Sequence, residues 1–594
     1  MITERSISVA SSLSDVMRDY AGDASASVGM YFWNTASRGY DHVSYAELVQ
    51  RSFAFGARVL NVGQIPGRVC LIACHSPYAT LVAFYGAISV GAIPMIFPMP
   101  RALGSPQALL ERINHWGLKF DRPAILVLEE GVKEKFHEEI PAQIPVIRLN
   151  DSPLGPWDLL PGPAVANTPD RNDVAFFQTT SSSTGDHKAV AISHGNILSN
   201  VSGIRAAVDM KANERMITWL PLFHDMGLVG TVLFSFCNRY PLYIMTPTQF
   251  IKRPALWLRG MSEHRCTITT APNFGYDYCS RISARDTAEF NLAGVKHFFI
   301  GAEPIRVSTI RDFCAKFESC GVRPEMIRPA YGLAESTIIT TISRPQAQAR
   351  FVFLDPGSIG VNQPTRVVAQ AGFDDSQPEQ PLGEKLVAAC TAGVPIEGMR
   401  VELADEDGSP VTDERCAGEI VIQGDSVALG YVNGAHRMID RFDRQRVATG
   451  DMGVMLDGEL FIIERIKNII IRNGENFLVS SLEQRLAEIL GVSHDNIAVF
   501  ESNIHDQSSE IVVLIEKHKG LSAEQIDPLL ARLPQEGFPI DLILFSRTRA
   551  IPRTTSGKKR HFICRKHFQN DALEFQSSIE VTPDRIAAAS TGRK

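Results

Sequence analysis

Short apolar runs alternate with helical patterns through the first two-thirds of the chain, and this alternation restricts the fold more than any other feature. Apolar runs at residues 68–75, 123–130, 215–223 and 297–304 each end in a polar or glycine-rich turn, and the first precedes a helical pattern over 77–97. Strand, turn and helix in alternation are typical of a parallel sheet with helices on both faces. The sequence therefore predicts an α/β fold with large doubly wound sheets that bind ligands at the carboxyl ends of their strands.

The pattern changes twice in the last third of the chain. Shorter strands separated by Gly, Asp and Pro turns indicate a β-rich subdomain over about 360–464. The helical and strand-like segments beyond it are typical of a separate, small α+β domain. We expect an N-terminal domain over 1–464, a hinge over 465–467 and a mobile C-terminal domain over 468–594.

Composition excludes several classes of function. With 594 residues the chain is long enough for two or more cores. Its 59 basic and 66 acidic residues give a net charge of -7, which offers no electrostatic footprint for nucleic acid. No stretch approaches the ~20 apolar residues of a transmembrane segment, and the start lacks the pattern of a signal peptide, so we expect a cytoplasmic protein. The ten cysteines are scattered, which predicts buried free thiols without zinc or disulfides.

Residues 178–189 read "QTTSSSTGDHKA", in which six consecutive hydroxyl residues precede Gly185 and Lys188. Hydroxyls, backbone N–H groups and a lysine can together surround a phosphate. A Walker loop is excluded, because that motif places Ser or Thr directly after its lysine and Ala189 stands there instead. The composition leaves two interpretations open: an ordinary surface loop, and a phosphate-binding loop of a different architecture.

Other polar segments share this character. Each has an ordinary structural explanation when taken alone, such as a core aromatic, a turn former or a solvated charge. They are "WLPLFHDMGLVG" at 219–230, "GAEPIR" at 301–306, "YGLAES" at 331–336, "TGD" at 449–451 and "PRTTSGK" at 552–558. Their joint occurrence in this order favours a functional interpretation.

Through these motifs the chain resembles the AMP-forming adenylating superfamily of acyl-CoA synthetases, peptide-synthetase adenylation domains and luciferases. Within it, the chain is most similar to the fatty acyl-AMP ligases. The resemblance extends from about Ser44 to Phe568, and the narrower match includes residues 219–230, 253–282 and 301–313.

The resemblance implies a ligase reaction in two steps. A fatty acid carboxylate attacks the α-phosphate of ATP, pyrophosphate leaves, and the acyl-adenylate is passed to a thiol. Two anions must meet in the first step, so cations and fixed dipoles have to neutralise both. The resemblance also implies Mg²⁺ bound to the phosphates.

Matching the family's motifs residue by residue implies the following roles. The loop for the β- and γ-phosphates would contain Thr180, Ser181, Ser183, Thr184, Gly185 and Lys188. The rest of the nucleotide site would contain Gly301, Ala302, Glu303, Tyr331 and Gly332 at the adenine, with Asp451 and Arg465 at the ribose. Catalysis would involve His224, Glu335 as the magnesium ligand, and Lys558. Lys467 would be the hinge about which the C-terminal domain rotates to bring Lys558 into the site and to withdraw it. The acyl pocket would be lined by Phe223, Asp225, Met226, Phe274 and Tyr278.

The phosphate loop departs from the family pattern "TSGSTGxPKG" at Ser182, His187 and Ala189. Loss of the first glycine matters if that position needs positive φ, where a Cβ costs ~1 kcal/mol or more. Because Lys188, Glu335, Asp451, Arg465 and Lys558 are all present, we expect an active enzyme.

The thiol acceptor is inferred from an insertion. The fatty acyl-AMP ligases differ from acyl-CoA synthetases by an insertion that braces the domains, and residues 350–375 occupy its location. This resemblance implies the phosphopantetheine thiol of an acyl carrier protein as acceptor. The alternatives are a fatty acyl-CoA ligase, an amino-acid adenylation enzyme that would use Asp225 for the substrate ammonium, and a non-catalytic nucleotide-binding homologue.

Overall fold

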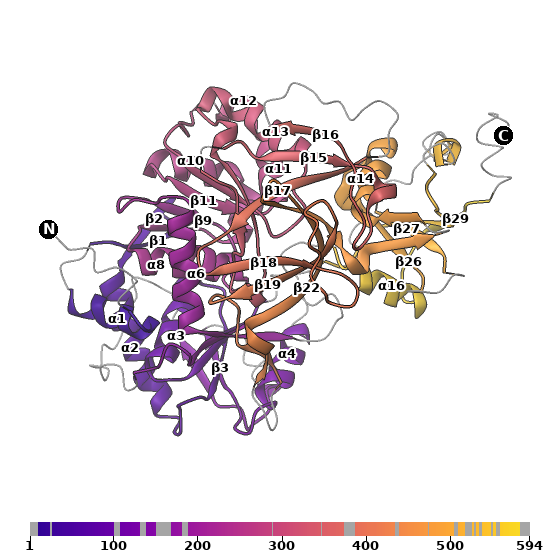
Figure 1. The fold of residues 1–594 in the computed structure, drawn as a ribbon. Coiled ribbons are helices and arrows are strands. Elements are labelled where there is room, and N and C mark those ends of the chain that lie inside the picture. The colour runs from indigo at the N-terminus through magenta and orange to yellow at the C-terminus, as the bar shows by residue number, and fades with distance from the viewer. Residues whose placement is uncertain are drawn as a thin grey trace.

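The computed structural model describes most of the chain in several stretches. These are residues 10–23, 27–99, 107–130, 138–149, 168–180, 188–287, 289–345, 347–372, 386–433, 439–472, 475–503, 509–516, 526–527, 530–533, 537–547, 550–553 and 559–582. The chain forms a large N-terminal body and a smaller C-terminal domain beside it (Figure 1).

The first large sheet forms the lower lobe in Figure 1 and is parallel at its centre. In spatial order its strands are β21 (Ile439–Arg441), β20 (Gly430–Val432), β8 (Ala189–Ser193), β7 (Val174–Thr179), β4 (Ile93–Ile96), β3 (Val69–Ala73), β5 (Ile125–Glu129) and β6 (Val146–Leu149). The pairs from β7 to β6 are parallel, whereas β8, β20 and β21 add on antiparallel.

Both faces of this sheet are covered. Along β3, Cys70 and Ile72 pack into a core that includes α3 (Pro77–Ser89), whereas Leu71 packs with Trp116 of α4 (Gln107–Gly117) in a second core. Successive strand residues point to opposite faces, so a strand buried on both sides has to be continuously apolar. This explains why the run at 68–75 lacks alternation.

The second large sheet joins a parallel part to an antiparallel part. Its main path runs β18 (Met399–Ala404), β19 (Gly418–Gly424), β22 (Arg446–Leu456), β23 (Glu459–Arg465), β17 (Val387–Pro395), β14 (Thr341–Ile342), β13 (Ile327–Tyr331), β12 (His297–Ile300), β11 (Ile268–Ala271), β9 (Met216–Thr218), β10 (Leu242–Ile244), β1 (Gly29–Asn34) and β2 (Gly39–Ser44). The hairpin of β15 (Arg350–Leu354) and β16 (Val367–Gly372) pairs with β17. Antiparallel pairing begins at β14, so the β-rich part continues the parallel sheet.

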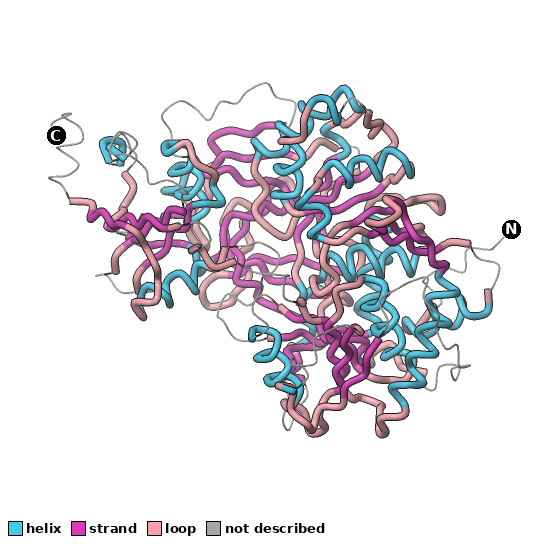
Figure 2. Tube along the Cα trace, turned by 180° about the vertical axis from the view of Figure 1, so that it is seen from behind, coloured by secondary structure: helices cyan, strands magenta, loops and turns pink. Residues whose placement is uncertain are grey.

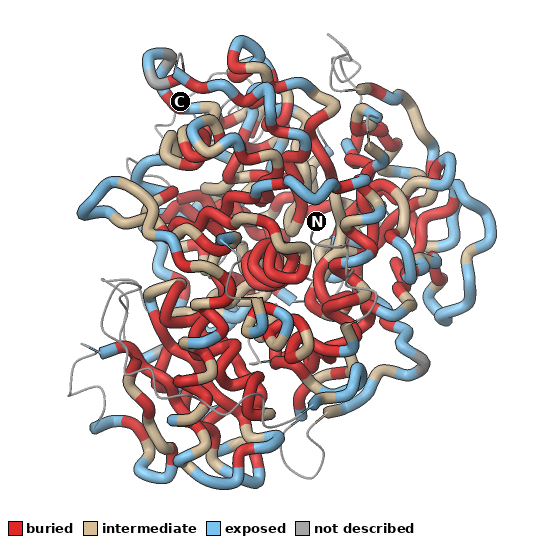
Figure 3. Tube along the Cα trace, turned by 90° about the vertical axis from the view of Figure 1, so that its left-hand side faces the viewer, coloured by how far each residue is buried: buried red, intermediate tan, exposed pale blue. Residues whose placement is uncertain are grey.

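Helices lie on both sides of these sheets (Figure 2). Among the described residues, the remaining α- and π-helices of the N-terminal body are α1 (Leu13–Gly22), α2 (Tyr45–Leu60), α6 (His194–Ala207), α7 (Asp225–Gly227), the π-helix η1 (Leu228–Leu233), α8 (Phe234–Asn238), α9 (Pro247–Lys252), α10 (Ala255–His264), α11 (Asn273–Ser280), α12 (Ala284–Thr287) and α13 (Val307–Phe317). Parallel strands with helices on both faces confirm the predicted α/β fold with doubly wound sheets. Buried residues fill the interior between sheets and helices, and exposed ones mark the loops (Figure 3).

The C-terminal domain follows a short 3₁₀ turn, η7 (Ile466–Asn468). Its elements are the hairpin β24 (Ile469–Arg472) and β25 (Glu475–Leu478), α14 (Val479–Leu490), the 3₁₀ turn η8 (His494–Asn496), β26 (Ile497–Glu501), β27 (Ile511–Glu516), β28 (Leu542–Ser546), α16 (His561–Gln569) and β29 (Ser577–Glu580). Strands β26 to β29 form their own four-stranded sheet with apolar cores on both faces.

Two further expectations concern the cysteines and membrane-spanning segments. All ten cysteines are buried, as predicted. Among the described residues, none of the helices has both the length and the apolar character needed to cross a bilayer.

The junction between β14 and β17 depends on Gly393. This residue has a φ of +78°, and a Cβ there would lie 2.0 Å from the carbonyl oxygen of Ile342. We expect Gly393→Ala to lower the free energy of unfolding by more than ~3 kcal/mol, because a backbone clash adds to the cost of positive φ. Chemical denaturation measures the change.

Gly408 provides the matched control. It has a φ of +80°, but nothing lies within 4 Å of the position that a Cβ would take there. Gly408→Ala should therefore cost only ~1–2 kcal/mol. Equal losses in the two variants would contradict the close approach at the β14–β17 junction.

Candidate active site

A cavity of about 2110 Å³ lies between the carboxyl ends of the parallel strands and the C-terminal domain. Its N-terminal wall includes Thr180 after β7, Gly301 after β12 and Gly332 after β13. The opposite wall includes Lys467 at η7 and Ser480 of α14. The cavity thus opens at the strand ends where the sequence predicts ligand binding.

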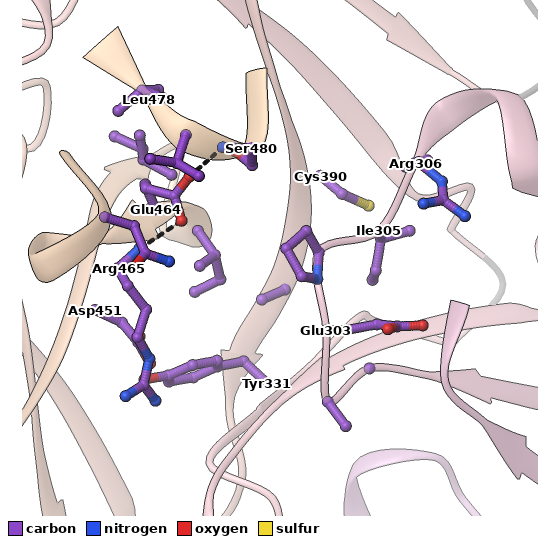
Figure 4. A pocket seen from close by; sticks show the side chains of 18 of the residues that line it. Glu303, Ile305, Arg306, Tyr331, Cys390, Asp451, Glu464, Arg465, Leu478 and Ser480 are labelled. Carbon is purple, nitrogen blue, oxygen red and sulfur yellow. Dashed lines mark hydrogen bonds and ion pairs between the residues drawn. The ribbon is translucent and has the colours of Figure 1, made fainter. Parts of the chain in front are cut away.

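Asp451 is the centre of one polar group in this cavity. The hydroxyl of Tyr331 donates to Asp451 Oδ2 at 2.8 Å, and Arg465 Nε lies 2.9 Å from Asp451 Oδ1. Asp451 on β22 and Arg465 on β23 are direct register partners, so the strand pairing itself brings the two charges together (Figure 4). Burial and then the charge of Asp451 raise the pKa of Tyr331 well above its usual value, which keeps its hydroxyl a donor.

Glu335 forms a second polar group with Tyr431. The Tyr431 hydroxyl donates to Glu335 Oε1 at 2.7 Å, and the Lys188 ammonium lies 5.5 Å from the centre of the Tyr431 ring. Burial raises the pKa of Glu335, and the hydrogen bond from Tyr431 partly offsets that effect. Tyr431 therefore contacts two predicted site residues at once.

The ends of the predicted phosphate loop are held together. Thr180 N donates to the Lys188 carbonyl at 3.0 Å, which extends the antiparallel pairing of β7 and β8. The predicted loop residues Ser181, Ser183, Thr184 and Gly185 lie outside the described residues, as does Lys558.

The segment from Gly301 to Arg306 lies against the start of α11. Glu303 Oε1 accepts a hydrogen bond from Phe274 N at 2.7 Å, and Asn273 Oδ1 accepts one from Arg306 N at 3.0 Å. Ala302 has a φ of +66°, uncommon for a residue with a Cβ, in the segment predicted to contact adenine. These contacts fix the backbone of the segment at the cavity wall.

His224 and Asp225 lie at the start of α7. His224 is the N-cap residue, and its Nδ1 lies 2.6 Å from Asp225 Oδ1 and 3.2 Å from Met226 N. The helix begins at Asp225 and continues into η1, and its first turn needs a capping group. The N-cap side chain takes that role, because it can accept from an N–H that the helix leaves without a partner.

The apolar part of the cavity includes two of the five predicted pocket residues. Its lining includes Asp225 and Met226, together with Ile204, Met216, Gly230, Phe234, Ile338 and Ile339. The three other predicted pocket residues, Phe223, Phe274 and Tyr278, are half-buried and pack against the core. The Phe274 ring meets Trp219 at 5.6 Å and Tyr278 at 6.0 Å, so these rings support the pocket from the side.

The hinge region is tied to α14 through Glu464. Its Oε1 accepts from Arg465 N at 3.0 Å and its Oε2 from Ser480 N at 2.9 Å (Figure 4). Burial raises the pKa of Glu464, and the bond from Ser480 acts in the opposite direction. Lys467 lies in η7, the turn that directly follows β23, whose last residue is Arg465. Glu464 thus links the strand before the predicted hinge to the helix after it.

The two domains also meet through Arg306 and His494. Arg306 Nη1 donates to His494 Nδ1 at 3.2 Å, and the other ring nitrogen lies 3.5 Å from Glu483 Oε2. Burial, with the nearby charge of Lys559, lowers the pKa of His494 to about 4. A neutral imidazole is required here, because only an unprotonated Nδ1 can accept from Arg306.

Three of these contact residues were missed by sequence reasoning: Tyr431, Glu464 and Gln178. Gln178 Nε2 donates to the Phe223 carbonyl at 2.8 Å and so joins the end of β7 to the segment that contains His224. A single Tyr, Glu or Gln has no distinctive spacing. The position of Gln178 directly before the hydroxyl-rich loop was the only signal available.

Comparisons with known proteins agree with this geometry. A model described as "AMP-binding enzyme" matches residues 19–432. The long-chain-fatty-acid–AMP ligase FadD32 of Mycolicibacterium smegmatis is 28% identical and covers 91% of each chain. The medium-chain-fatty-acid–[acyl-carrier-protein] ligase JamA of Moorena producens is 28% identical, covering 98% of this chain and 99% of its own.

Solved structures of similar proteins have the same fold. A structure from a study of fatty acyl-adenylate ligases of E. coli and L. pneumophila superposes with a TM-score of 0.78 at 24% identity, covering 95% of this chain and 99% of that one. The fatty acid AMP ligase from Legionella pneumophila superposes with a TM-score of 0.69 at 27% identity, covering 98% and 100%.

Acid should destabilise the C-terminal domain through His494. Its folded pKa of about 4 lies below the ordinary value of 6.5, so the unfolded chain binds more protons between these pH values. The contribution to the free energy of unfolding is full above about pH 6.5 and is lost as the pH falls toward 4. We expect the urea midpoint to fall over this window, and to fall less in His494→Asn.

His567→Asn is the matched control, because His567 is a half-buried histidine on α16 of the same domain. It should keep the wild-type slope of stability against pH. The same slope in His494→Asn would show that this histidine is not held neutral in the folded domain.

Proposed function

This chain belongs to the AMP-binding enzyme family, and we propose that it activates a fatty acid as an acyl-adenylate and passes the acyl group to an acyl carrier protein. The observation that carries the proposal is a cavity with two different ends. One end holds the Tyr331–Asp451–Arg465 group and Glu335, and the other is lined by apolar side chains including Met216 and Phe234. This gradient suits a nucleotide joined to an acyl chain.

At the polar end, the Asp451 carboxylate accepts hydrogen bonds from both ribose hydroxyls, and Arg465 holds that carboxylate in place. The segment of Gly301, Ala302 and Glu303 lines the adenine slot with Tyr331 and Gly332. The backbone is closely packed at this wall of the proposed slot. A Cβ at Gly332 would lie 1.6 Å from the Ile338 carbonyl oxygen, so only glycine fits at this position.

The phosphates are held by the hydroxyl-rich loop with Lys188, in this proposal, and Glu335 holds Mg²⁺. Among the described residues no group of three or more His, Cys, Asp and Glu could hold a metal by itself. A metal bound mainly through substrate phosphates and water needs only one or two carboxylates, so Glu335, which lines the cavity, fits that requirement. When bound there, Mg²⁺ would supply positive charge that offsets the negative charge of the phosphates.

Chemistry at the α-phosphate is assigned to Lys558, and His224 lies beside the place where the fatty acid carboxylate would enter. A cation at this point lowers the repulsion between carboxylate and phosphate as the new bond forms. The C-terminal domain rotates about Lys467 to bring Lys558 in for adenylation and to remove it for thiol transfer.

The carrier protein is favoured as acceptor over CoA by the packing of the insertion. In its hairpin, Val352 and Leu354 share an apolar core with Leu478, which lies beyond the hinge. Asn476 Nδ2 also donates to the Ile359 carbonyl at 2.6 Å. These contacts join the insertion to β25 and so support a brace between the domains, as expected of a carrier-protein ligase.

An amino-acid substrate is less well supported. Asp225 would have to bind the substrate ammonium, but its carboxylate already contacts His224 and accepts from Met226 N at 2.7 Å. The apolar lining beyond it suits an alkyl chain better.

ATP–pyrophosphate exchange with a panel of fatty acids and amino acids tests the activity. We expect exchange with fatty acids only. Offering CoA or a holo-carrier protein to the responding acid should then give transfer to the carrier alone, because the braced hinge disfavours productive CoA binding.

Exchange with amino acids, or efficient transfer to CoA, would contradict the proposal. ATP binding without exchange for any acid would identify a protein that keeps the fold without the chemistry.

A further inference from the structure

Glu483 is a buried carboxylate of the C-terminal domain, on the wall that this domain contributes to the cavity. It lies on α14 with 1% of its surface exposed. Lys559 Nζ donates to its Oε2, while His561 Nε2 and Val499 N donate to its Oε1 at 2.7 and 3.0 Å. Burial alone would raise the pKa of Glu483, but the charge of Lys559 and the contact with His561 lower it to about 2.

Lys559 is held by more than an ion pair. Its ammonium also donates to the carbonyls of His494 at 3.1 Å and Ile497 at 2.7 Å, and only 8% of its side chain is exposed. All three ammonium protons therefore have acceptors. A buried charge is tolerated only when it is partnered in this way, so Glu483 and the two carbonyls form a specific site for Lys559.

The Lys559 site fixes a short piece of backbone. Lys559 forms an antiparallel bridge with Arg553, and Arg560 N donates to the Pro552 carbonyl at 2.9 Å. Immediately afterwards α16 begins at His561, whose side chain is the second partner of Glu483. The residue bonded directly to the N-terminal side of Lys559 is Lys558.

We propose that Glu483 is a positioning residue for adenylation, which sets the place of Lys558 by holding Lys559 and His561. The inference rests on the proposed function, in which Lys558 acts at the α-phosphate. A side chain that acts on a developing charge has to be held within a fraction of an ångström, and supporting residues one step away supply that constraint. In this proposal the two adjacent lysines have different roles: the buried Lys559 anchors the backbone, and Lys558 acts on the substrate.

The proposal separates the two half-reactions. If Glu483 positions Lys558, its loss should slow adenylation and change the KM for ATP little, because the contacts proposed for adenine, ribose and pyrophosphate lie in the other domain. Transfer from preformed acyl-adenylate to the carrier thiol should also be unchanged, since Lys558 is withdrawn in that step. A purely structural residue would show no such division.

Glu483→Gln is the test variant, because it keeps the shape of the side chain and removes the charge that holds Lys559. Its matched control is Leu486→Ala, one turn further along α14, where a fully buried core side chain is truncated without touching the Lys559 site. Lys558→Ala, expected to abolish adenylation, sets the lower limit of the assay. We expect kcat for adenylation to fall by about 10²-fold in Glu483→Gln, and to stay near wild type in Leu486→Ala.

Hydrogen exchange measured on the same proteins without substrate tests the positioning separately from the activity. Glu483→Gln should accelerate exchange at residues 559–561 more than in β26 and β27, and Leu486→Ala should not show this local effect. Normal adenylation by Glu483→Gln, equal slowing in both variants, or unchanged local exchange would each overturn the proposal. A wild-type protein without acid-dependent exchange would count against the proposed function alone, and the hydrogen-exchange comparison would still decide the role of Glu483.

Discussion

The carboxylate of Asp451 is the constraint on which the rest of the site depends. It joins three strands, because its partners Tyr331 and Arg465 lie on β13 and β23 while Asp451 itself lies on β22. A buried charge is costly unless strong donors surround it, and an arginine with a buried tyrosine hydroxyl meets that need. Since β23 leads directly into η7, this group also sets the point from which the C-terminal domain starts. The predicted ribose site and the predicted hinge are therefore positioned by the same group of residues.

Other polar residues of the cavity also each connect two separate parts of the structure. Tyr431 joins Glu335 to Lys188, Glu464 joins the end of β23 to α14, and Glu483 joins α14 to the segment before α16. Each pairing links elements that are distant in sequence. In surroundings of low dielectric such contacts are stronger than in water, and an unpaired member would be costly. Polar contacts therefore hold the described side chains at the polar end of the cavity, whereas its apolar end is shaped by packing.

Much of the fold could be predicted from the sequence, because burial on both faces makes a central strand continuously apolar and so visible, as at Val69 to Ala73. The positions of Tyr331, Asp451 and Arg465 were predicted through motifs, and the structure brings these three side chains together. Their roles stay predictions, as do those of the loop residues from Ser181 to Gly185 and of Lys558. Tyr431 and Glu483 could not be predicted, because strand pairing and helix packing choose their partners. Met216 and Phe234, which line the apolar part of the cavity, could not be identified from the sequence, since their depth depends on how η1 packs.

A crystal structure with a non-hydrolysable acyl-adenylate analogue that carries a fatty acyl chain would test the two-ended cavity directly. We predict that both ribose hydroxyls lie within hydrogen-bond distance of Asp451 and that the alkyl chain follows the lining of Ile204, Met216 and Phe234. An analogue whose ribose lies away from Asp451, or whose chain leaves the cavity by another route, would contradict this assignment.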